Sequence, residues 1–382
     1  MRIEPFVMER WQSTFEHRVA FNLSESGVHP LTLKELLEMP GEDGVLTHDE
    51  LDEILLGYTQ GNGLEALRER VGLLYPGSGL PNILLTHGGA EANFLTTLRL
   101  VEPGDEVVML LPNYMQAHGL VRGWGAELIP WPMLAERSWE PDPDALDEAV
   151  SEKTRLIIIT NPNNPTGRVL RQPILDRVAA AADRVGAYIL SDEIYRGAEL
   201  SGEEAPTLWG SYERLLITSG LSKAYGLPGL RMGWVISPDE ALIYDLWSYH
   251  DYSTISHSAV TERLALHAME PARRNRILER TRGILNRNLP LLLEWVDGQG
   301  DLFTYVEPEA GAILWLRYNL EINSSDLAER TRAEQDTLIV PGDHFGMDHY
   351  LRMGYGPEPD YLLEGLRRLR NVLESCAAPS AA

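Results

Sequence analysis

One lysine in the sequence stands in a setting that favours chemistry. Lys223 lies in the segment Gly220-Leu-Ser-Lys-Ala-Tyr-Gly-Leu-Pro-Gly-Leu-Arg-Met-Gly233, with Arg231 eight positions after it. The segment follows the apolar run Arg214–Thr218, which is typical of a buried strand. Because α/β proteins bind ligands at the carboxyl ends of parallel strands, a lysine here can reach a ligand. Most lysines are solvated surface residues, so this segment alone does not decide the matter.

Two further polar segments each end an apolar run. They are Asn161-Pro-Asn-Asn-Pro-Thr-Gly167 and Ser191-Asp-Glu-Ile-Tyr195. We expect Asp192 to lie at the same sheet edge as Lys223, where a buried carboxylate needs a partner because leaving it unpaired is costly. A turn, a helix cap and a packed tyrosine would explain the segments singly. The occurrence of these segments together at one sheet edge predicts a functional site.

The elements that must position these residues alternate between strand length and helix length. Helical spacing is found in Glu91–Leu100 and Arg171–Val185. The alternation predicts right-handed crossovers and a largely parallel sheet in an α/β fold. After about residue 260 the longer helical stretches predict a smaller α+β lobe. We therefore expect an N-terminal arm over 1–44, a large domain over 45–260 and a small domain over 261–382. The strand-like runs are Glu106–Leu111, Arg155–Thr160, Ala187–Ser191, Arg214–Thr218 and Gly233–Ile236.

Composition excludes several classes of function. The chain has 382 residues, with 33 Lys+Arg against 57 Asp+Glu and a net charge of −24. Such an acidic surface argues against nucleic-acid and membrane partners. Cys376 is the single cysteine, and the ten histidines show no ligand spacing, so we expect neither a disulfide within the chain nor a metal site. Without a signal-like segment or a long apolar run, the expected location is the cytoplasm.

The lysine, asparagine and aspartate–tyrosine segments resemble those of the fold-type I pyridoxal-phosphate enzymes, specifically the class I/II aminotransferase family. The resemblance extends from roughly Asn22 to Arg352. It implies a large domain with a mostly parallel seven-stranded sheet sandwiched by helices, and a smaller α+β domain. It also implies that the cofactor is pyridoxal 5'-phosphate.

By this resemblance, Lys223 forms the Schiff base with the cofactor, and Asp192 pairs with the ring nitrogen and makes the ring an electron sink. Asn164 and Tyr195 would hydrogen-bond the phenolic oxygen of the cofactor. Tyr114, in Pro112-Asn-Tyr114, would stack on the ring. The resemblance thus assigns catalytic roles to Lys223, Asp192 and Tyr195.

The phosphate group of the cofactor has its own expected residues. Thr86-His-Gly-Gly-Ala-Glu-Ala-Asn93 is similar to the glycine turn that opens a helix in this family, so the N–H groups of Gly89 and Ala90 would bind phosphate. Arg231 would add a charge-assisted contact and Ser222 a hydroxyl. The sequence departs from the family pattern at Gly220, where many members carry a phosphate-binding serine, and at Ala117, where an aromatic residue is frequent.

Two other segments imply a partner and a substrate contact. Gly57-Tyr-Thr-Gln-Gly-Asn-Gly63 resembles the segment whose tyrosine reaches the phosphate of the neighbouring subunit, so Tyr58 implies a homodimer with shared active sites. Arg352, in Tyr350-Leu-Arg-Met-Gly354, would hold the substrate α-carboxylate in the bidentate manner that guanidinium favours. Asn164 is also expected to contact the substrate.

The family resemblance implies transamination of an L-amino acid. Lys223 would take the Cα proton, and the quinonoid carbanion would be reprotonated on the cofactor to give a 2-oxo acid. The segment Phe21-Asn-Leu-Ser-Glu-Ser-Gly-Val28 is more like the subgroup that contains capreomycidine synthase, which cyclises a hydroxylated arginine. Cyclisation or elimination on such a substrate is therefore the alternative.

The side-chain pocket has only loosely indicated members. Glu25, Gly27, Val28, His29 and the segment Tyr249–His257 are the candidates. Four glutamates of the N-terminal arm would favour a cationic substrate side chain, although a generally acidic surface explains them equally well. They are Glu4, Glu9, Glu16 and Glu25.

Overall fold

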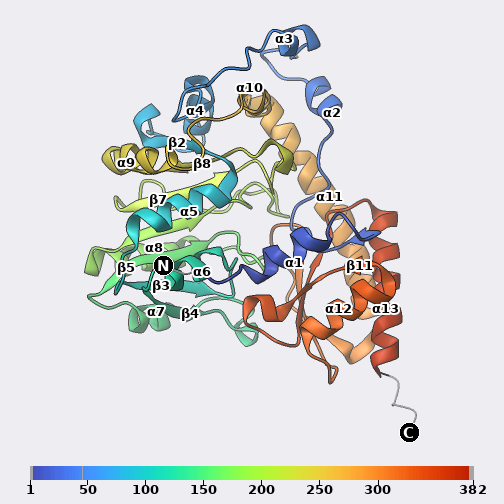
Figure 1. Ribbon diagram of the computed structural model, residues 1–382. Helices are drawn as coiled ribbons and strands as arrows, with labels where there is room; N and C mark the ends of the chain where they lie inside the picture. The colour runs from blue at the N-terminus through green and yellow to red at the C-terminus, as the bar shows by residue number, and fades with distance from the viewer. Residues whose placement is uncertain (1–2, 45, 378–382) are drawn as a thin grey trace.

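A seven-stranded sheet forms the centre of the molecule. The computed structural model describes residues 3–44 and 46–377. The strand order is β2-β8-β7-β6-β5-β3-β4, and all neighbours are parallel except that β8 runs antiparallel to both β2 and β7 (Figure 1). This confirms the predicted fold class. The strands are β2 (Ile83–Thr86), β3 (Glu106–Leu111), β4 (Glu127–Pro132), β5 (Thr154–Thr160), β6 (Tyr188–Asp192), β7 (Leu215–Gly220) and β8 (Gly233–Ile236).

Both faces of this sheet are buried, which explains the uninterrupted apolar runs. Successive side chains of a strand point to opposite faces. In β5, Ile157 and Ile159 belong to one core cluster, and Leu156 and Ile158 belong to the other. One face is covered by α5 (Gly88–Leu100), α6 (Gln116–Gly123) and α9 (Glu240–His250), and the other by elements that include α7 (Pro143–Ala149) and α8 (Gln172–Val185).

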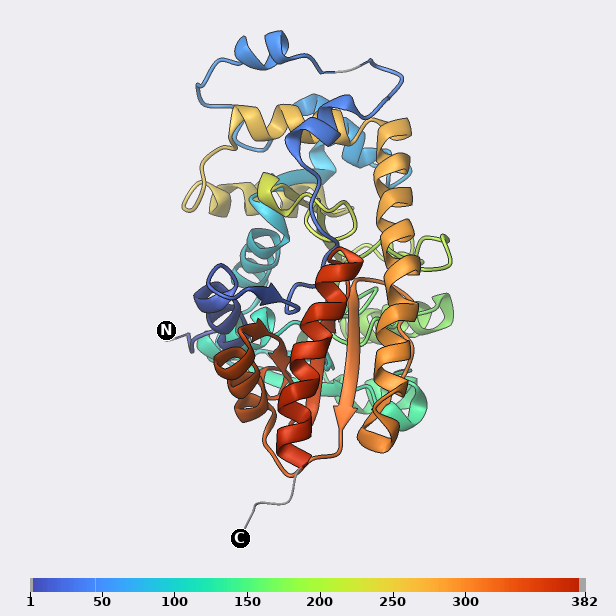
Figure 2. The ribbon, with the colours of Figure 1, turned by 90° about the vertical axis from the view of Figure 1, so that its right-hand side faces the viewer.

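The C-terminal part forms a second, smaller layer of antiparallel strands and helices. Its strand order is β12-β13-β10-β9. Figure 2 shows α11 and α13 beside each other, with a strand of this small sheet between them. The elements are α11 (Pro271–Asp297), β9 (Phe303–Tyr305), β10 (Ile313–Tyr318), α12 (Ser324–Gln335), β12 (Val340–Pro341), β13 (Tyr350–Gly354) and α13 (Pro359–Ala377); α10 (Ala259–Ala268) precedes them in the chain.

The N-terminal arm is tied to this smaller layer. β1 (Phe21–Asn22) pairs in parallel with β11 (Thr337–Leu338). Before it, α1 (Val7–Phe15) lies between the central sheet and the C-terminal helices (Figure 1). After it, the chain passes through α2 (Leu33–Glu38), α3 (His48–Asp52) and α4 (Glu65–Gly72). The arm therefore approaches the carboxyl edge of the large sheet from the side of the small one.

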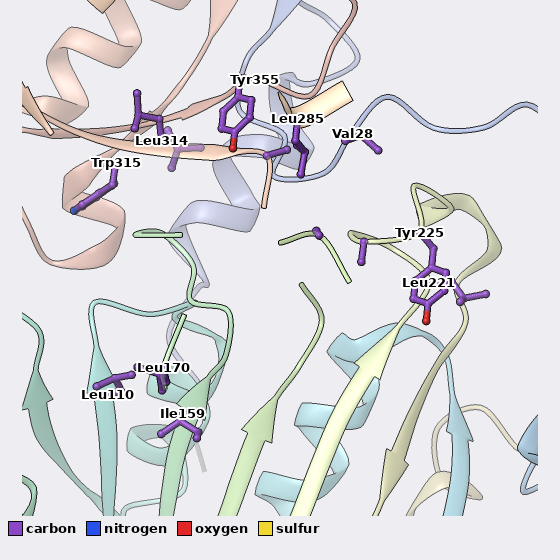
Figure 3. Close-up of a cluster of buried hydrophobic side chains, with 14 of the residues drawn as sticks. Val28, Leu110, Ile159, Leu170, Leu221, Tyr225, Leu285, Leu314, Trp315 and Tyr355 are labelled. Atoms are coloured by element: carbon purple, nitrogen blue, oxygen red, sulfur yellow. The ribbon is translucent and has the colours of Figure 1, made fainter. Parts of the chain in front are cut away.

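One continuous apolar cluster joins the two layers. Figure 3 shows side chains from the large sheet and its loops, among them Leu110, Ile159 and Leu170, together with Leu314 and Trp315 of the small sheet. Because these groups pack into one core, the small sheet is held over the carboxyl ends of the large one. No helix among the described residues is long and apolar enough to cross a membrane.

Candidate active site

The carboxyl ends of three neighbouring strands bring predicted site residues together. β5, β6 and β7 run parallel, and their register aligns Thr160 with Asp192, and Asp192 with Thr218. The chain leaves β7 at Gly220 and reaches Lys223 after one short turn. Lys223 and Asp192 therefore line the same cavity at this edge of the sheet, as expected from their positions after apolar runs.

Asp192 is a buried carboxylate whose described hydrogen-bond partners include no cation. The residue is 8% exposed. Its oxygens accept hydrogen bonds from Asn93 Nδ2 at 2.9 Å and from the backbone N–H of Ile194 at 3.0 Å. Burial raises the pKa of Asp192, and the two hydrogen bonds oppose that change. A cationic nitrogen of a bound group would complete its surroundings.

Lys223 lies beside the N-terminal arm. Its Nζ is 3.8 Å from Oε2 of Glu25. Gly27 packs against the stem of the lysine, since a Cβ at Gly27 would lie 3.6 Å from Lys223 Cδ. The arm thus limits where the lysine side chain can go.

Close backbone packing beneath the start of α5 explains why Gly220 stands where many family members carry a phosphate-binding serine. Gly220 pairs with Gly233 of β8, and a Cβ at Gly220 would lie 2.7 Å from the carbonyl oxygen of Met232. A Cβ at Gly233 would lie 2.5 Å from the carbonyl carbon of Gly88. A serine therefore does not fit at position 220 without a backbone shift. Ser222, which lines the cavity, supplies a nearby hydroxyl instead.

The first turn of α5 is suited to an anion. Gly88 has a φ of +74°, and the N–H groups of Gly89 and Ala90 lie in the helix turn that has no backbone acceptors of its own. A Cβ at Gly88 would lie 2.7 Å from Nη2 of Arg231. Arg231 holds a left-handed φ of +48°, a costly conformation for a residue other than glycine. The helix start and the guanidinium together can bind phosphate.

Tyrosine and asparagine side chains form another part of the cavity wall. The hydroxyl of Tyr114 donates to Oε1 of Glu9 at 2.8 Å. Burial, and then the charge of Glu9, raise the pKa of Tyr114, so its hydroxyl stays protonated. Tyr195 and Asn164 are both buried and line the cavity. Oδ1 of Asn164 accepts a hydrogen bond from Nη1 of Arg352 at 3.2 Å.

Arg352 reaches the cavity from β13 of the small sheet. It is 1% exposed, and its Nη2 donates to the carbonyl oxygen of Ser24 at 2.6 Å. Its Nε is buried and has no acceptor among the described residues. Nε and the second N–H of Nη2 are therefore available as a pair of donors, the arrangement that recognises a carboxylate.

The N-terminal arm closes one side of the cavity. Gln12 of α1 donates to Ser24 O at 2.9 Å and to Ser24 Oγ at 3.1 Å. Met8 Sδ lies 3.6 Å from Nη1 of Arg352. These contacts place Met8, Gln12 and three glutamates, Glu9, Glu16 and Glu25, in the cavity wall.

The cavity has a volume of about 260 Å³ and gathers most of the predicted site residues. The predicted residues that line it are Glu25, Gly89, Ala90, Tyr114, Asn164, Asp192, Tyr195, Ser222, Lys223, Arg231 and Arg352. They come from the large sheet, the small sheet and the arm. The site is thus a meeting point of three parts of the chain.

Other predicted residues do not line this cavity. Val28 is buried in the apolar core (Figure 3). His29 turns away, with Nε2 3.0 Å from Oε1 of Glu358. Gly27 packs against the stem of Lys223 but is not in the cavity lining, and Tyr58 is 90% exposed. The segment 249–257 and Glu4 are likewise absent from the lining.

Several lining residues were not predicted from the sequence. Asn93 is the hydrogen-bond donor to Asp192, and Thr160 ends the strand beside it. Asn93 lies within the quoted glycine segment, and its place one turn after Gly89 could have suggested an inward position. Met8 and Gln12 depend on how the arm folds, which residue spacing does not give.

Comparison with known proteins decides the family. The family described as "Aminotransferase class I and II" matches residues 46–369. The chain belongs to this family. Capreomycidine synthase of Streptomyces vinaceus is 34% identical over 374 residues, covering 96% of this chain and 93% of that protein. A PLP-dependent aminotransferase of Streptococcus suis has a TM-score of 0.90 and 32% identity, with both chains fully covered.

A solved PLP-dependent cyclase, OrfR, is also similar, with a TM-score of 0.89, 26% identity and 99% of both chains covered. This aminotransferase-family chain is a pyridoxal 5'-phosphate-dependent enzyme, which confirms the predicted family and cofactor. The residues fit the group on structural grounds. A buried Asp192 lacks a cationic partner, a helix start beside Arg231 suits the phosphate, and Lys223 reaches the space between them.

Proposed function

We propose that this enzyme acts on the α-amino group of an L-amino acid with a cationic side chain. The observation that carries the proposal is the composition of one cavity. Arg352 offers free donors for an α-carboxylate, Lys223 offers an amine, and Glu9, Glu16 and Glu25 supply carboxylates from the arm. An acidic side-chain region opposite a carboxylate-binding arginine favours a substrate such as arginine over a dicarboxylate.

The cofactor would be held along the edge of the large sheet. Asp192 would pair with the ring nitrogen, Tyr114 would cover the ring, and Asn164 and Tyr195 would hydrogen-bond its phenolic oxygen. When bound, the cofactor supplies an electron sink for the electron pair left at Cα. Its phosphate would be bound by a set of backbone and side-chain donors near α5. These are Gly89, Ala90, Ser222 and Arg231.

The protein's own residues then carry the proton and orient the substrate. Lys223 would hold the cofactor, and its Nζ would accept the Cα proton of the substrate. Arg352 fixes the α-carboxylate and so holds the Cα–H bond toward that amine. The arm excludes water by covering the cavity with Met8 and Gln12.

Glu16 and Glu25 carry the proposed side-chain selectivity. Burial, and then the charge of Glu25, raise the pKa of Glu16. Glu9 already accepts a hydrogen bond from Tyr114. A guanidinium or ammonium group between Glu16 and Glu25 would relieve their repulsion, whereas a substrate carboxylate would add to it.

A second reaction outcome has a specific observation in its favour. Glu16 lines the cavity, and burial followed by the charge of Glu25 raises its pKa, which favours its protonated form. A carboxylic acid there can protonate a hydroxyl that leaves Cβ, which would direct the reaction toward elimination or cyclisation rather than transamination. The similarity to capreomycidine synthase and to a cyclase structure is consistent with this alternative.

A homodimer with shared active sites belongs to the same proposal. Exposed apolar side chains gather on two adjoining loops, where Thr59 Oγ1 donates to the carbonyl oxygen of His257 at 3.0 Å. Such a patch is typical of a protein interface. It would bring Tyr58 to the phosphate of the neighbouring subunit. Its members are Leu55, Leu56, Tyr58, Tyr252 and Ile255. The domain bounds given above and a cytoplasmic location remain predictions.

The shared site can be tested with hybrid dimers. Chains carrying Tyr58→Ala and chains carrying Lys223→Ala are each expected to be poorly active or inactive. Co-expressed, they would form dimers with one intact site, so activity should return. Dimers that assemble in sedimentation experiments without any recovered activity would contradict the assignment of Tyr58.

Substrate choice is tested by comparing L-arginine with its neutral isostere L-citrulline. Glu16→Gln should lower the kcat/KM preference for arginine by about tenfold to a hundredfold, because a charge-assisted contact is lost. Glu4→Gln is the matched control, since Glu4 lies on the arm but outside the cavity. Equal use of arginine and citrulline by the unmodified enzyme would contradict the cationic substrate.

The reaction outcome is tested with substrate alone and no 2-oxo acid acceptor. One equivalent of 2-oxo acid per subunit indicates transamination. Continued product formation from a β-hydroxylated arginine indicates elimination or cyclisation. Failure to take up the cofactor at all would contradict the whole proposal.

A further inference from the structure

Asp192 depends on one amide side chain for its position. Among the described residues, Asn93 is the only side chain that hydrogen-bonds the Asp192 carboxylate, with Nδ2 2.9 Å from Oδ2. The other donor is the backbone N–H of Ile194 on Oδ1. Ala117 lines a small cavity beside Asp192 together with Asn93, but its methyl group cannot donate a hydrogen bond. Among the described residues, no other side chain therefore donates a hydrogen bond to Oδ2 of Asp192.

The amide of Asn93 is itself oriented by a hydroxyl. Thr218 Oγ1 donates to Asn93 Oδ1 at 2.7 Å. Because this bond occupies the amide oxygen, the amide nitrogen is turned toward Asp192. Thr218 and Asp192 are register partners on β7 and β6, so the three side chains form a short chain of hydrogen bonds. All three residues are buried, which strengthens such bonds and makes an unmet one costly.

The position of Asn93 also links the two ends of the proposed cofactor site. Asn93 is on α5, about one turn after Gly89 and Ala90, whose N–H groups face the proposed phosphate position. One helix thus carries the phosphate contacts at its start and the Asp192 contact one turn later. A shift of α5 would move both together.

We propose that Asn93, oriented by Thr218, is the positioning residue that keeps Asp192 ionised and aimed at the ring nitrogen of pyridoxal phosphate. This inference rests on the proposed role of Asp192. Burial alone favours the neutral acid, which cannot pair with a protonated ring nitrogen. The amide donor stabilises the carboxylate in advance, so the ion pair can form when the cofactor binds.

The test measures the dissociation constant of the apoenzyme for pyridoxal phosphate and for its 1-deaza analogue, in which a C–H group replaces the ring nitrogen. Asn93→Leu and Thr218→Val should each weaken pyridoxal phosphate binding by about tenfold or more, as expected for a lost hydrogen bond to a charged group. Neither variant should change the affinity for the 1-deaza analogue. Thr218→Ser, which keeps the hydroxyl, should restore normal binding.

Thr97→Val is the matched control. Thr97 is an equally buried hydroxyl on α5, but it donates to the backbone carbonyl of Asn93 at 2.7 Å and not to the amide side chain. Its loss should leave both affinities unchanged.

Two results would overturn the inference. In the first, the variants lose affinity equally for pyridoxal phosphate and the 1-deaza analogue, which would mean that Asn93 only packs α5. In the second, neither Asn93→Leu nor Thr218→Val changes the affinity for pyridoxal phosphate. An unmodified apoenzyme that binds neither compound would instead contradict the proposed function. Unfolding curves of each apoenzyme identify a variant that has lost its fold, and Thr218→Val then carries the test.

Discussion

Arg352→Lys gives the sharpest check on how the substrate is oriented. The guanidinium donates to Ser24 O and Asn164 Oδ1, while its Nε and the second N–H of Nη2 remain for a ligand. A lysine keeps the charge but presents no fixed pair of donors. We expect the variant to lose about one charge-assisted hydrogen bond to the α-carboxylate, which is ~1.5–3 kcal/mol or about a 10- to 150-fold loss in kcat/KM.

The assay compares L-arginine with agmatine, which has the same cationic side chain and no carboxylate. Spectral titration of the loaded enzyme gives the affinity for each compound, and steady-state rates give kcat/KM for arginine. The variant should weaken arginine binding and leave agmatine binding nearly unchanged. Because agmatine cannot contact the carboxylate-binding donors, it reports on every other effect of the substitution.

An equal loss for both compounds would refute the assignment. It would mean that Arg352 acts by holding Asn164 and Ser24 in place and not by binding the substrate. An unchanged arginine affinity would refute it as well. Thermal unfolding of the variant separates either result from a loss of structure, since the buried guanidinium also supports its neighbours.

Two other substitutions test the packing and the charge around the site. Gly220→Ser should lower the unfolding free energy by ~1–3 kcal/mol, because the Cβ of the serine would lie 2.7 Å from Met232 O. The added hydroxyl should not improve the affinity for the cofactor. An unchanged melting temperature would contradict this prediction. Burial raises the pKa of Glu193 to about 7 from 4.5, so the folded protein keeps a proton that the unfolded chain releases in this range. This group therefore lowers stability as pH rises from about 4.5 to about 7. Glu193→Gln should gain up to ~3 kcal/mol relative to wild type between pH 5 and pH 8 in urea unfolding, and a gain independent of pH would contradict the assignment.

The central strands could be predicted closely and the edge strands could not. Glu106–Leu111 and Gly233–Ile236 match β3 and β8 to the residue, because each is an apolar run bounded by Pro, Gly or polar residues. The two strands that were not predicted, β2 and β4, are the two edges of the sheet. β4 contains Pro130 and Pro132. An edge strand tolerates proline because the backbone N–H groups on its outer side have no partner strand, so a missing N–H there breaks no hydrogen bond of the sheet. From the sequence alone, such prolines are interpreted as residues that interrupt a strand.

The site residues likewise fall into those whose position the sequence predicts and those whose position it does not. Lys223 and Asp192 directly follow or end buried strands, so the sheet itself determines where they lie. Glu16 and Met8 reach the cavity only because the arm docks on the small sheet, with Trp11 Nε1 donating to the carbonyl oxygen of Ile339 at 2.9 Å. That docking joins residues more than 300 positions apart, and no local pattern encodes it. His29, which the sequence suggested for the pocket, contacts Glu358 instead.

The arrangement separates the chemistry common to the family from the choice of substrate. The large sheet provides the amine of Lys223 and the carboxylate of Asp192, and the small sheet provides Arg352. In their proposed roles none of these residues would distinguish one amino acid side chain from another, since Asp192 contacts the cofactor and the other two act on groups that every α-amino acid has. The arm brings the carboxylates of Glu16 and Glu25 into the cavity wall, where they would face the substrate side chain under the proposed function. An ionised Glu16 would favour a cationic side chain, whereas a protonated Glu16 would instead donate a proton to a leaving group. Under the proposed function, the arm and not the sheet would therefore determine both the substrate and the reaction that follows removal of the Cα proton.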